Sequence, residues 1–168
     1  MAFKYWCLAL ISPIVFALDQ FTKYLVIRDM VPGSHLAVIP GWFDIVHYSN
    51  SGAAFGFLSG ADSSWRGPFF HIVSIVALII IIVYIVKTPP LEKLTPIALS
   101  LVVGGIFGNG LDRVRFGSVT DFLSVHVQDK FLWGVRLEWP AFNVADSAIT
   151  VAMVLLIISV LKKKERSS

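Results

Sequence analysis

The run FFHIVSIVALIIIIVYIV, residues 69–86, contains no charged side chain and has four consecutive isoleucines at its centre, residues 79–82. A helix needs about 20 mostly apolar residues to cross the hydrocarbon core of a bilayer. Three further stretches are comparably apolar, at residues 5–27, 96–115 and 143–161. We therefore predict an all-α membrane protein with four transmembrane helices.

Composition supports this class of protein. The chain has 168 residues, of which 56% are hydrophobic and only 15% are charged, and its mean hydropathy is +0.76. An ordinary soluble domain is about one quarter charged. The length suits a single membrane-embedded domain over residues 1–168. The one cysteine, Cys7, cannot form an internal disulfide.

The first apolar stretch is predicted to be a retained helix rather than a cleaved signal peptide. It is too long for the apolar region of a signal peptide, and it contains Asp19 and Lys23. No convincing small-residue cleavage site follows it.

Basic residues predict the orientation. Lys4, the short connection with Lys87 and Lys93, and the tail at residues 162–166 all fall on one side of a four-helix arrangement. The positive-inside rule places both termini in the cytoplasm, and it places the two long loops, residues 28–68 and 116–142, outside. The basic tail directly follows an apolar helix, so it marks a membrane end rather than a nucleic-acid partner.

The first outer loop is predicted to contain a small β element. Residues 35–39 and 43–48 look like short strands separated by Pro40 and Gly41. Residues 61–66 are expected to form a short helix of their own.

Polar residues recur at helical spacing near the outer ends of three predicted helices. Asn109 and Asp112 are three residues apart, as are Asn143 and Asp146, and residues at this spacing share a helix face. Asp19 lies at the corresponding depth of the first helix. The topology therefore predicts one polar layer at the outer membrane surface.

Each of these residues also has a structural interpretation. Asp19 and Lys23 are equally consistent with a structural ion pair. For Asp112 we favour a pocket-shaping role, because the neighbouring Arg113 can neutralise it. From spacing alone, we interpret Asp121 as an ordinary loop carboxylate.

Two further interpretations concern the helices themselves. Asn143 is a better helix cap than Asp146. The glycines between residues 104 and 110 favour close helix packing over phosphate binding.

Several common catalytic patterns are missing from the sequence. The four histidines show no paired spacing for zinc, and there is no nucleophile elbow and no phosphate-binding loop. The run from Gly108 to Asp112 differs by one residue from the G-x-G-D motif of presenilin-type proteases. We therefore expect neither a metal nor a cofactor.

Taken together, the polar motifs resemble those of the bacterial lipoprotein signal peptidase family (signal peptidase II). Their order, the four-span layout and the length all agree, and the resemblance covers essentially the whole chain. The motifs that carry it are Asp19 with Lys23, Asn50-Ser51-Gly52-Ala53-Ala54-Phe55-Gly56, Gly108-Asn109 with Asp112-Arg113, Asp121-Phe122, and Pro140-Ala141-Phe142-Asn143-Val144-Ala145-Asp146-Ser147.

The resemblance implies an aspartic endopeptidase of the bacterial inner membrane, with its active site near the outer face. Its catalytic pair falls on Asp121 and Asp146. Supporting, substrate-binding positions fall on Asp19, Asn50, Gly52, Asn109, Asp112, Arg113 and Asn143. The stretch at residues 124–138 is longer than the family leads us to expect.

The implied substrate is a prolipoprotein whose cysteine already carries diacylglycerol, cut just before that cysteine. Membrane lipid and cyclic-peptide antibiotics that occupy the substrate site are further implied partners, and we expect a monomer. Two nearby carboxylates share one proton, so one can activate water while the other polarises the scissile carbonyl.

Two rival functions agree less well with the sequence. An ion channel or transporter subunit needs polar groups along the full bilayer depth, whereas residues 75–83 of the second helix contain none. A purely structural scaffold gives no reason for Asp121 and Asp146 to coincide with the catalytic positions of a family.

Overall fold

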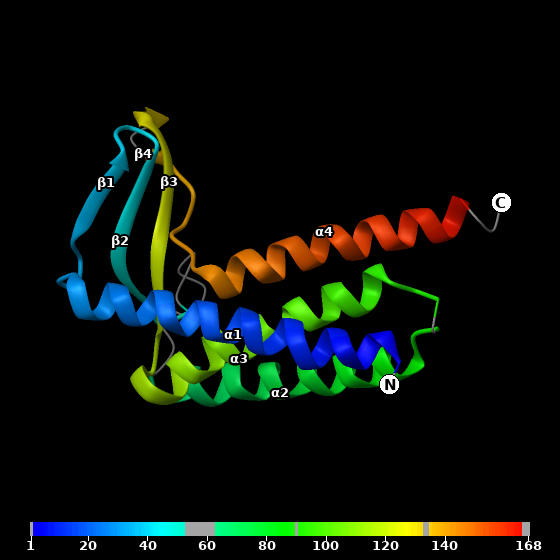
Figure 1. Ribbon diagram of the computed structural model, residues 1–168. Helices are drawn as coiled ribbons and strands as arrows, with labels where there is room; N and C mark the ends of the chain where they lie inside the picture. The colour runs from blue at the N-terminus through cyan, green and yellow to red at the C-terminus, as the bar shows by residue number, and fades with distance from the viewer. Residues whose placement is uncertain (1, 53–62, 90, 133–134, 166–168) are drawn as a thin grey trace.

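The computed structural model describes residues 2–52, 63–89, 91–132 and 135–165, and it contains four long helices and a small antiparallel sheet (Figure 1). The helices are α1 (Phe3–Asp29), α2 (Ser63–Lys87), α3 (Leu94–Phe116) and α4 (Val144–Glu165). Each is long and apolar enough to cross a membrane. The predicted fold class, four apolar helices with a small β element, is confirmed.

Helix α3 is the centre of the bundle because small residues let its neighbours approach closely. A Cβ atom added at Gly104 would lie 2.8 Å from the carbonyl oxygen of Ser12 in α1. One added at Gly105 would lie 2.8 Å from the carbonyl oxygen of Ala145 in α4. The predicted packing role is confirmed for Gly104, Gly105 and Gly108, but it was wrong for Gly110, where an added Cβ atom would meet nothing within 4 Å. The close contacts bring the polar residues of α1, α3 and α4 together.

Helix α2 packs less tightly and exposes apolar side chains around most of its surface. Ile79, Ile80 and Ile82 are all more than half exposed, whereas Ile81 and Ile85 are buried against α3. A helix that is apolar on all sides suits a lipid environment. Its exposed face is therefore the surface that meets hydrocarbon in a bilayer.

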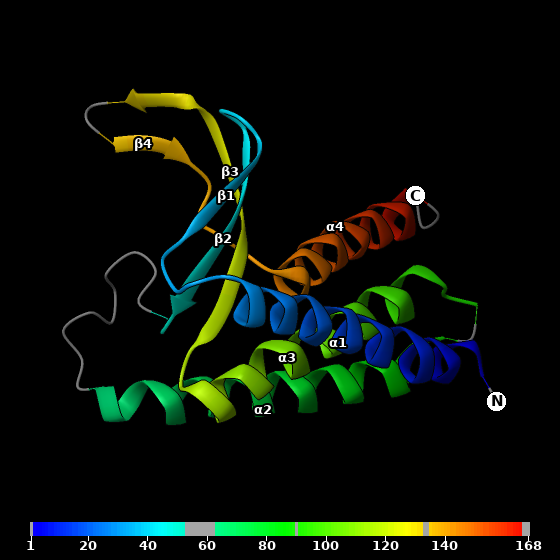
Figure 2. The same ribbon diagram turned by 60° about the vertical axis from the view of Figure 1, so that its left-hand side comes forward.

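The sheet stands at one end of the bundle (Figure 2). Strands β1 (His35–Ile39) and β2 (Phe43–Asn50) form the predicted hairpin. Strand β3 (Val119–Leu132) pairs antiparallel with β2 and, further along, with β4 (Val135–Glu138). The order is β1-β2-β3-β4.

The second outer region, residues 116–142, contains the longest strand. Gly117 ends α3 in the left-handed conformation (φ 72°), and the chain turns directly into the 14-residue strand β3. The expected short helix at residues 61–66 was wrong, because residues 63–66 belong to α2. Residues 61 and 62 lie outside the described part.

Helix α4 is held against the sheet where it begins. The amides of Phe122 and Leu123 both donate to the carbonyl oxygen of Phe142, at 3.0 and 2.8 Å, and the Phe142 amide donates back to Leu123 at 3.0 Å. These three backbone hydrogen bonds hold the first turn of α4 beside β3. The start of α1 and the end of α4 both lie at the opposite end of the bundle (Figure 1).

Candidate active site

Asp121 lies on strand β3, opposite Tyr48 of β2, and its carboxylate is almost fully buried. One oxygen accepts a hydrogen bond from the Asn143 side-chain amide at 2.8 Å, and the other accepts one from the Asn50 amide at 2.9 Å. A strand holds this carboxylate more rigidly than the loop position that we predicted. Two elements distant in the sequence therefore orient it.

Asp146 lies in the first turn of α4 and forms a reciprocal cap with Asn143. The Asp146 amide donates to the Asn143 side-chain oxygen at 2.9 Å, while the Asn143 amide donates to the Asp146 carboxylate at 3.2 Å. Such a pairing satisfies two amides that a helix start leaves unbonded. Asn143 is thus the cap that we predicted, and Asp146 takes part in it.

Asn143 also joins the two carboxylates. Its backbone amide bonds Asp146, and its side-chain amide bonds Asp121. The side chain is fully buried. Asn143 therefore fixes both aspartates relative to the start of α4, and it gathers them at one place in the molecule.

Asn109 of α3 supports Asp146 from the other side. Its side-chain amide donates to Asp146 at 2.8 Å, while its oxygen accepts from the Lys23 ammonium at 2.9 Å and from Asn143 at 3.1 Å. Because an ammonium only donates, Lys23 forces the oxygen of Asn109 toward itself. The nitrogen of Asn109 must then face Asp146.

Lys23 lies in a buried cluster of charges between α1 and α3. Its ammonium is 2.8 Å from Asp19 and 3.1 Å from Asp112, and all three side chains are at most 2% exposed. Asp19 also accepts from the Ala145 amide at 2.9 Å. The cluster therefore holds α1, α3 and the start of α4 together, as the structural interpretation of Asp19 with Lys23 predicted.

The expected pairing of Asp112 with Arg113 was wrong. Asp112 is neutralised by Lys23 and accepts from the Thr120 amide at 2.9 Å and from Gln20 at 3.1 Å. It is turned toward α1 and away from its neighbour in the sequence. Adjacent residues on a helix project about 100° apart, so tertiary partners decide which one meets the carboxylate.

Arg113 lies close enough to the two aspartates for its positive charge to act on Asp146 and Asp121. Its guanidinium donates a long hydrogen bond to the Asn109 carbonyl oxygen at 3.5 Å. The guanidinium carbon lies 4.6 Å from the centre of the Phe70 ring, a cation–π contact. Arg113 is therefore placed to favour negative charge at this site.

Asn50 and Gly52 form the edge of the site at the end of β2. The Gly52 amide donates to the Asn50 side-chain oxygen at 2.8 Å, and Gly52 has a positive φ of 83°. A Cβ atom there would collide with the Phe70 ring. Glycine is thus required both by backbone conformation and by space. The sequence also leads us to expect that the outer loop at residues 50–57 covers the substrate peptide, and residues 53–57 of this loop lie outside the described residues.

Three contributors were not predicted from the sequence. Gln20 bridges Asp19, Asp112 and the carbonyl oxygen of Gly108 at 3.1–3.2 Å, and Thr120 and Phe70 contact Asp112 and Arg113 respectively. Only Gln20 had a signal, a polar residue beside Asp19 within an apolar helix. The contacts of Thr120 and Phe70 depend on how strand β3 and helix α2 pack against α3, which no local sequence pattern predicts.

Burial sets the proton affinity of Asp121. Loss of water raises the pKa of this carboxyl from its usual 3.8 to about 6, against the lowering effect of the Asn50 hydrogen bond. This pKa of about 6 already includes a raising effect of the negative charge of Asp146 and a lowering effect of the Asn143 hydrogen bond. Asp121 therefore holds a proton below about pH 6, beside a second carboxyl on which the charge of Arg113 acts.

The arrangement can perform general acid and base chemistry with two carboxyl groups. The described residues include no group of three or more histidine, cysteine, aspartate or glutamate side chains suited to a metal ion. A carboxylate pair that carries one proton is able to take a proton from water and to give one to an oxygen.

Comparison with protein families gives one match over most of the chain. The model of the family described as signal peptidase (SPase) II matches residues 11–162. The chain is 41% identical to a lipoprotein signal peptidase of Syntrophus aciditrophicus over 155 residues, 92% of each chain. It is 45% identical to one of Syntrophotalea carbinolica over 152 residues, 90% of this chain and 89% of the relative.

Solved structures show the same architecture. Two chains described as bacterial membrane enzyme structures obtained by the in meso method, at 1.9 and 2.3 Å resolution, superpose with TM-scores of 0.77 and 0.78. Both are 35% identical to this chain. The matched share is 92% of each chain for the first, and 96% of this chain and 91% of the other for the second.

Proposed function

The chain belongs to the signal peptidase II family, and we propose that Asp121 and Asp146 are the catalytic pair with which it cuts prolipoproteins just before a diacylglyceryl-modified cysteine. Members of this family are membrane aspartic peptidases that remove signal peptides from prolipoproteins. The observation that carries the residue assignment is the Asn143 bridge, which binds both carboxylates at once.

The pKa of Asp121 suggests how the two roles divide. Asp121, with its pKa raised to about 6, is the carboxyl that holds the shared proton in the free enzyme. Asp146 accepts hydrogen bonds from Asn109 and from the Asn143 amide, and Arg113 attracts its negative charge. Asp146 is therefore the carboxylate that removes a proton from water.

The reaction then takes the usual course for a carboxylate pair. Water attacks the scissile carbonyl carbon as Asp146 takes its proton, and Asp121 donates its proton to the carbonyl oxygen. When the tetrahedral intermediate collapses, the C–N bond breaks. The proton held by Asp146 passes to the leaving amine of the lipidated cysteine, and Asp121 recovers a proton from the hydroxyl of the new carboxyl group. The pair returns to its starting state.

Apolar hollows near the site supply a place for the lipid. One of about 310 Å³ lies between α2 and α3 and includes Gly110 and Val114, close to Arg113. A second, of about 510 Å³, continues along α1, α2 and α3 and shares Phe16, Leu78 and Phe107 with the first. We propose these hollows for the diacylglyceryl chains, which would be held there by close packing rather than by removal from water, because the chains come from the bilayer.

Lipidation of the substrate is expected to control cleavage. A precursor with diacylglycerol on its cysteine should be cut at least about a hundredfold more efficiently, by kcat/KM, than the same precursor without it, because acyl chains held in the hollows position the scissile bond beside the two carboxyl groups. Both precursors are to be assayed with purified protein in the same bilayers. Equal efficiency for the two would contradict the proposed substrate class.

The pH profile of cleavage should follow Asp121. Below about pH 6 this carboxyl is protonated, and above about pH 6 it loses the proton that it donates to the scissile carbonyl, so kcat/KM should fall as pH rises beyond about 6. Asn50→Ala removes a hydrogen bond that lowers the pKa of Asp121. The variant should move the falling limb to higher pH, and a limb that moves to lower pH would refute the assignment of the proton to Asp121.

We further propose that the sheet and the aspartate pair face the outer side of the bacterial inner membrane, with both termini in the cytoplasm. The excess of lysine at the opposite end of the bundle supports this orientation, because basic loops stay in the cytoplasm. The substrate's cysteine would then be cut at the outer surface.

Thiol labelling tests the orientation. Val31, beside the sheet, and Leu91, at the opposite end, are 75% and 94% exposed. In a Cys7→Ala background, Val31→Cys should react with a membrane-impermeant maleimide on intact spheroplasts, and Leu91→Cys should react only after lysis. The reverse pattern would invert the topology.

A further inference from the structure

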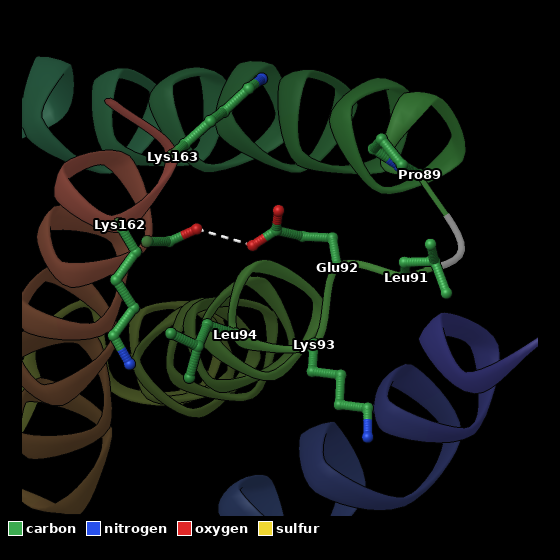
Figure 3. Close-up of a pocket in the computed structure, with 8 residues that line it drawn as sticks. Pro89, Leu91, Glu92, Lys93, Leu94, Lys162 and Lys163 are labelled. Carbon is green, nitrogen blue, oxygen red and sulfur yellow. Dashed lines mark hydrogen bonds between the residues drawn. The ribbon is translucent and has the colours of Figure 1, made fainter. Parts of the chain in front are cut away.

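The end of the bundle opposite the sheet is organised around Glu92, in the connection between α2 and α3. One carboxylate oxygen accepts hydrogen bonds from the Ser159 hydroxyl of α4 at 2.7 Å and from the Thr95 hydroxyl at 3.1 Å. This bridge ties α4 to the start of α3, and Figure 3 shows Glu92 beside Lys93 in the connection. Two hollows adjoin the bridge.

The first hollow, of about 410 Å³, opens between the connection and the end of α4, and Lys93, Lys162 and Lys163 line it. The second, of about 260 Å³, lies between the ends of α2 and α4. Lys163 lines this hollow as well, whereas Lys87, Tyr84, Leu156 and Val160 line the second hollow and not the first.

The second hollow is lined by two lysines, Lys87 and Lys163, and by the polar side chains of Glu92, Thr95 and Ser159. Lys87 comes from the last turn of α2 and Lys163 from the last turns of α4. Figure 3 shows the Lys163 side chain extending toward α2, whereas Lys93 and Lys162 point away to the other side. Glu92 contributes one negative charge, which interacts with the charge of Lys163. Two lysines against one glutamate leave the second hollow with a net positive charge.

Below this rim the wall is apolar and exposed. Tyr84 and Val160 are 55% and 66% exposed and lie on α2 and α4, and Leu156 continues the wall one turn further along α4. These side chains belong to membrane-spanning segments. A cationic rim above an apolar interhelical wall matches the two halves of an anionic phospholipid.

We propose that the second hollow binds the phosphodiester of an anionic membrane phospholipid between Lys87 and Lys163, with its acyl chains against Tyr84, Leu156 and Val160. The apolar wall selects the lipid over a free phosphate, because only the lipid has chains to cover it. Lys4 at the same end takes no part, since its ammonium donates to the carbonyl oxygens of Val86 and Thr88 at 2.6 and 3.0 Å.

The inference is independent of the proposed cleavage reaction, because the two sites lie at opposite ends of the helices. At this end of the bundle Glu92 joins the α2–α3 connection to α4 through its hydrogen bond with Ser159. A bound headgroup would add a bridge between α2 and α4. Ligands that bind only the native state stabilise it. The lipid should therefore raise the unfolding temperature without taking part in catalysis.

Native mass spectrometry of the full-length protein tests the site. The delipidated protein is incubated in detergent with equal amounts of phosphatidylglycerol and phosphatidylcholine that carry identical acyl chains. Wild type should retain phosphatidylglycerol in preference to phosphatidylcholine. Lys87→Gln and Lys163→Gln should each lower the ratio of the two bound lipids about fivefold, and together about twentyfold.

Lys93→Gln and Lys162→Gln are the matched controls, since they remove the same charge from side chains that line the first hollow and not the second, and Lys87→Gln is the variant that affects the second hollow alone. They should change the ratio by less than about twofold, and an equal effect of all four variants would show diffuse surface charge and overturn the proposal. Equal retention of both lipids by wild type would also overturn it. Displacement of the lipid by soluble glycerol phosphate would identify a free-phosphate site instead.

Discussion

Asp146→Asn and Asp121→Asn are each expected to lower the rate of prolipoprotein cleavage by on the order of a thousandfold or more. An asparagine keeps the size of the side chain and can keep part of its hydrogen bonding, but it cannot accept and return a proton. Single-turnover cleavage of a lipidated precursor in bilayers measures the effect without a contribution from product release.

The double variant should be scarcely slower than either single one. Two carboxyls that share one proton act as a unit, so the loss of either removes the whole contribution. Additive effects, with the double variant slower by the product of both losses, would show that Asp121 and Asp146 work independently.

Folding controls separate this result from a structural defect. Asp121→Asn removes a buried carboxyl whose pKa is raised to about 6 by burial, so its unfolding temperature at pH 7 should be unchanged or higher. Both single variants should still bind a cyclic-peptide inhibitor of the family. Ready cleavage by either folded variant, with Asp19→Asn or Asp112→Asn inactive instead, would move the catalytic pair elsewhere.

Lys23→Met is expected to produce the largest loss of stability. It leaves the carboxylates of Asp19 and Asp112 buried without their shared cation, and breaking a buried ion pair costs about 3–5 kcal/mol. The free energy of unfolding in mixed detergent micelles measures the loss. The Asn109 amide also loses the ammonium that fixes its orientation toward Asp146, so cleavage should fall as well.

Arg28→Gln is the matched control for a lysine or arginine that pairs on the same helix. Arg28 contacts Asp29 at 2.6 Å, but both side chains are more than half exposed, so its loss should leave the unfolding free energy unchanged. If Lys23→Met does not fold, adding Asp19→Asn and Asp112→Asn should restore folding. Failure of this rescue, or a loss no greater than that of Arg28→Gln, would contradict the role of the cluster.

The helices could be predicted from sequence because one local property decides them. An uninterrupted apolar run such as residues 69–86 has few alternatives to a spanning helix, and the predicted hairpin rested on alternation around Pro40 and Gly41. Strand β3 escaped prediction because its pairing with β2 is not local. Residues 123–128 alternate apolar and polar side chains, as a strand does, but this short pattern does not show that the strand spans 14 residues or that β2 is its partner.

The sequence predicted most of the residues that form the site, but it did not predict which of their side chains contact one another. Helical spacing placed Asn109, Asp112, Asn143 and Asp146 in one layer, and the structure brings them together. Spacing did not show that Lys23 would neutralise Asp112, because the approach of α1 to Gly108 decides this contact. A Cβ atom at Gly108 would lie 2.5 Å from the Asp19 carboxylate, which shows how closely the two helices meet.

Intact-mass analysis of the cleavage products tests the central claim most directly. Purified protein in bilayers is given a diacylglyceryl-modified prolipoprotein of known sequence. We predict two products, a signal peptide ending at the residue before the lipidated cysteine and a lipoprotein with that cysteine at its free amino terminus, and neither product from the Asp121→Asn/Asp146→Asn double variant. A cut at another bond, or the same products from the double variant, would contradict the account.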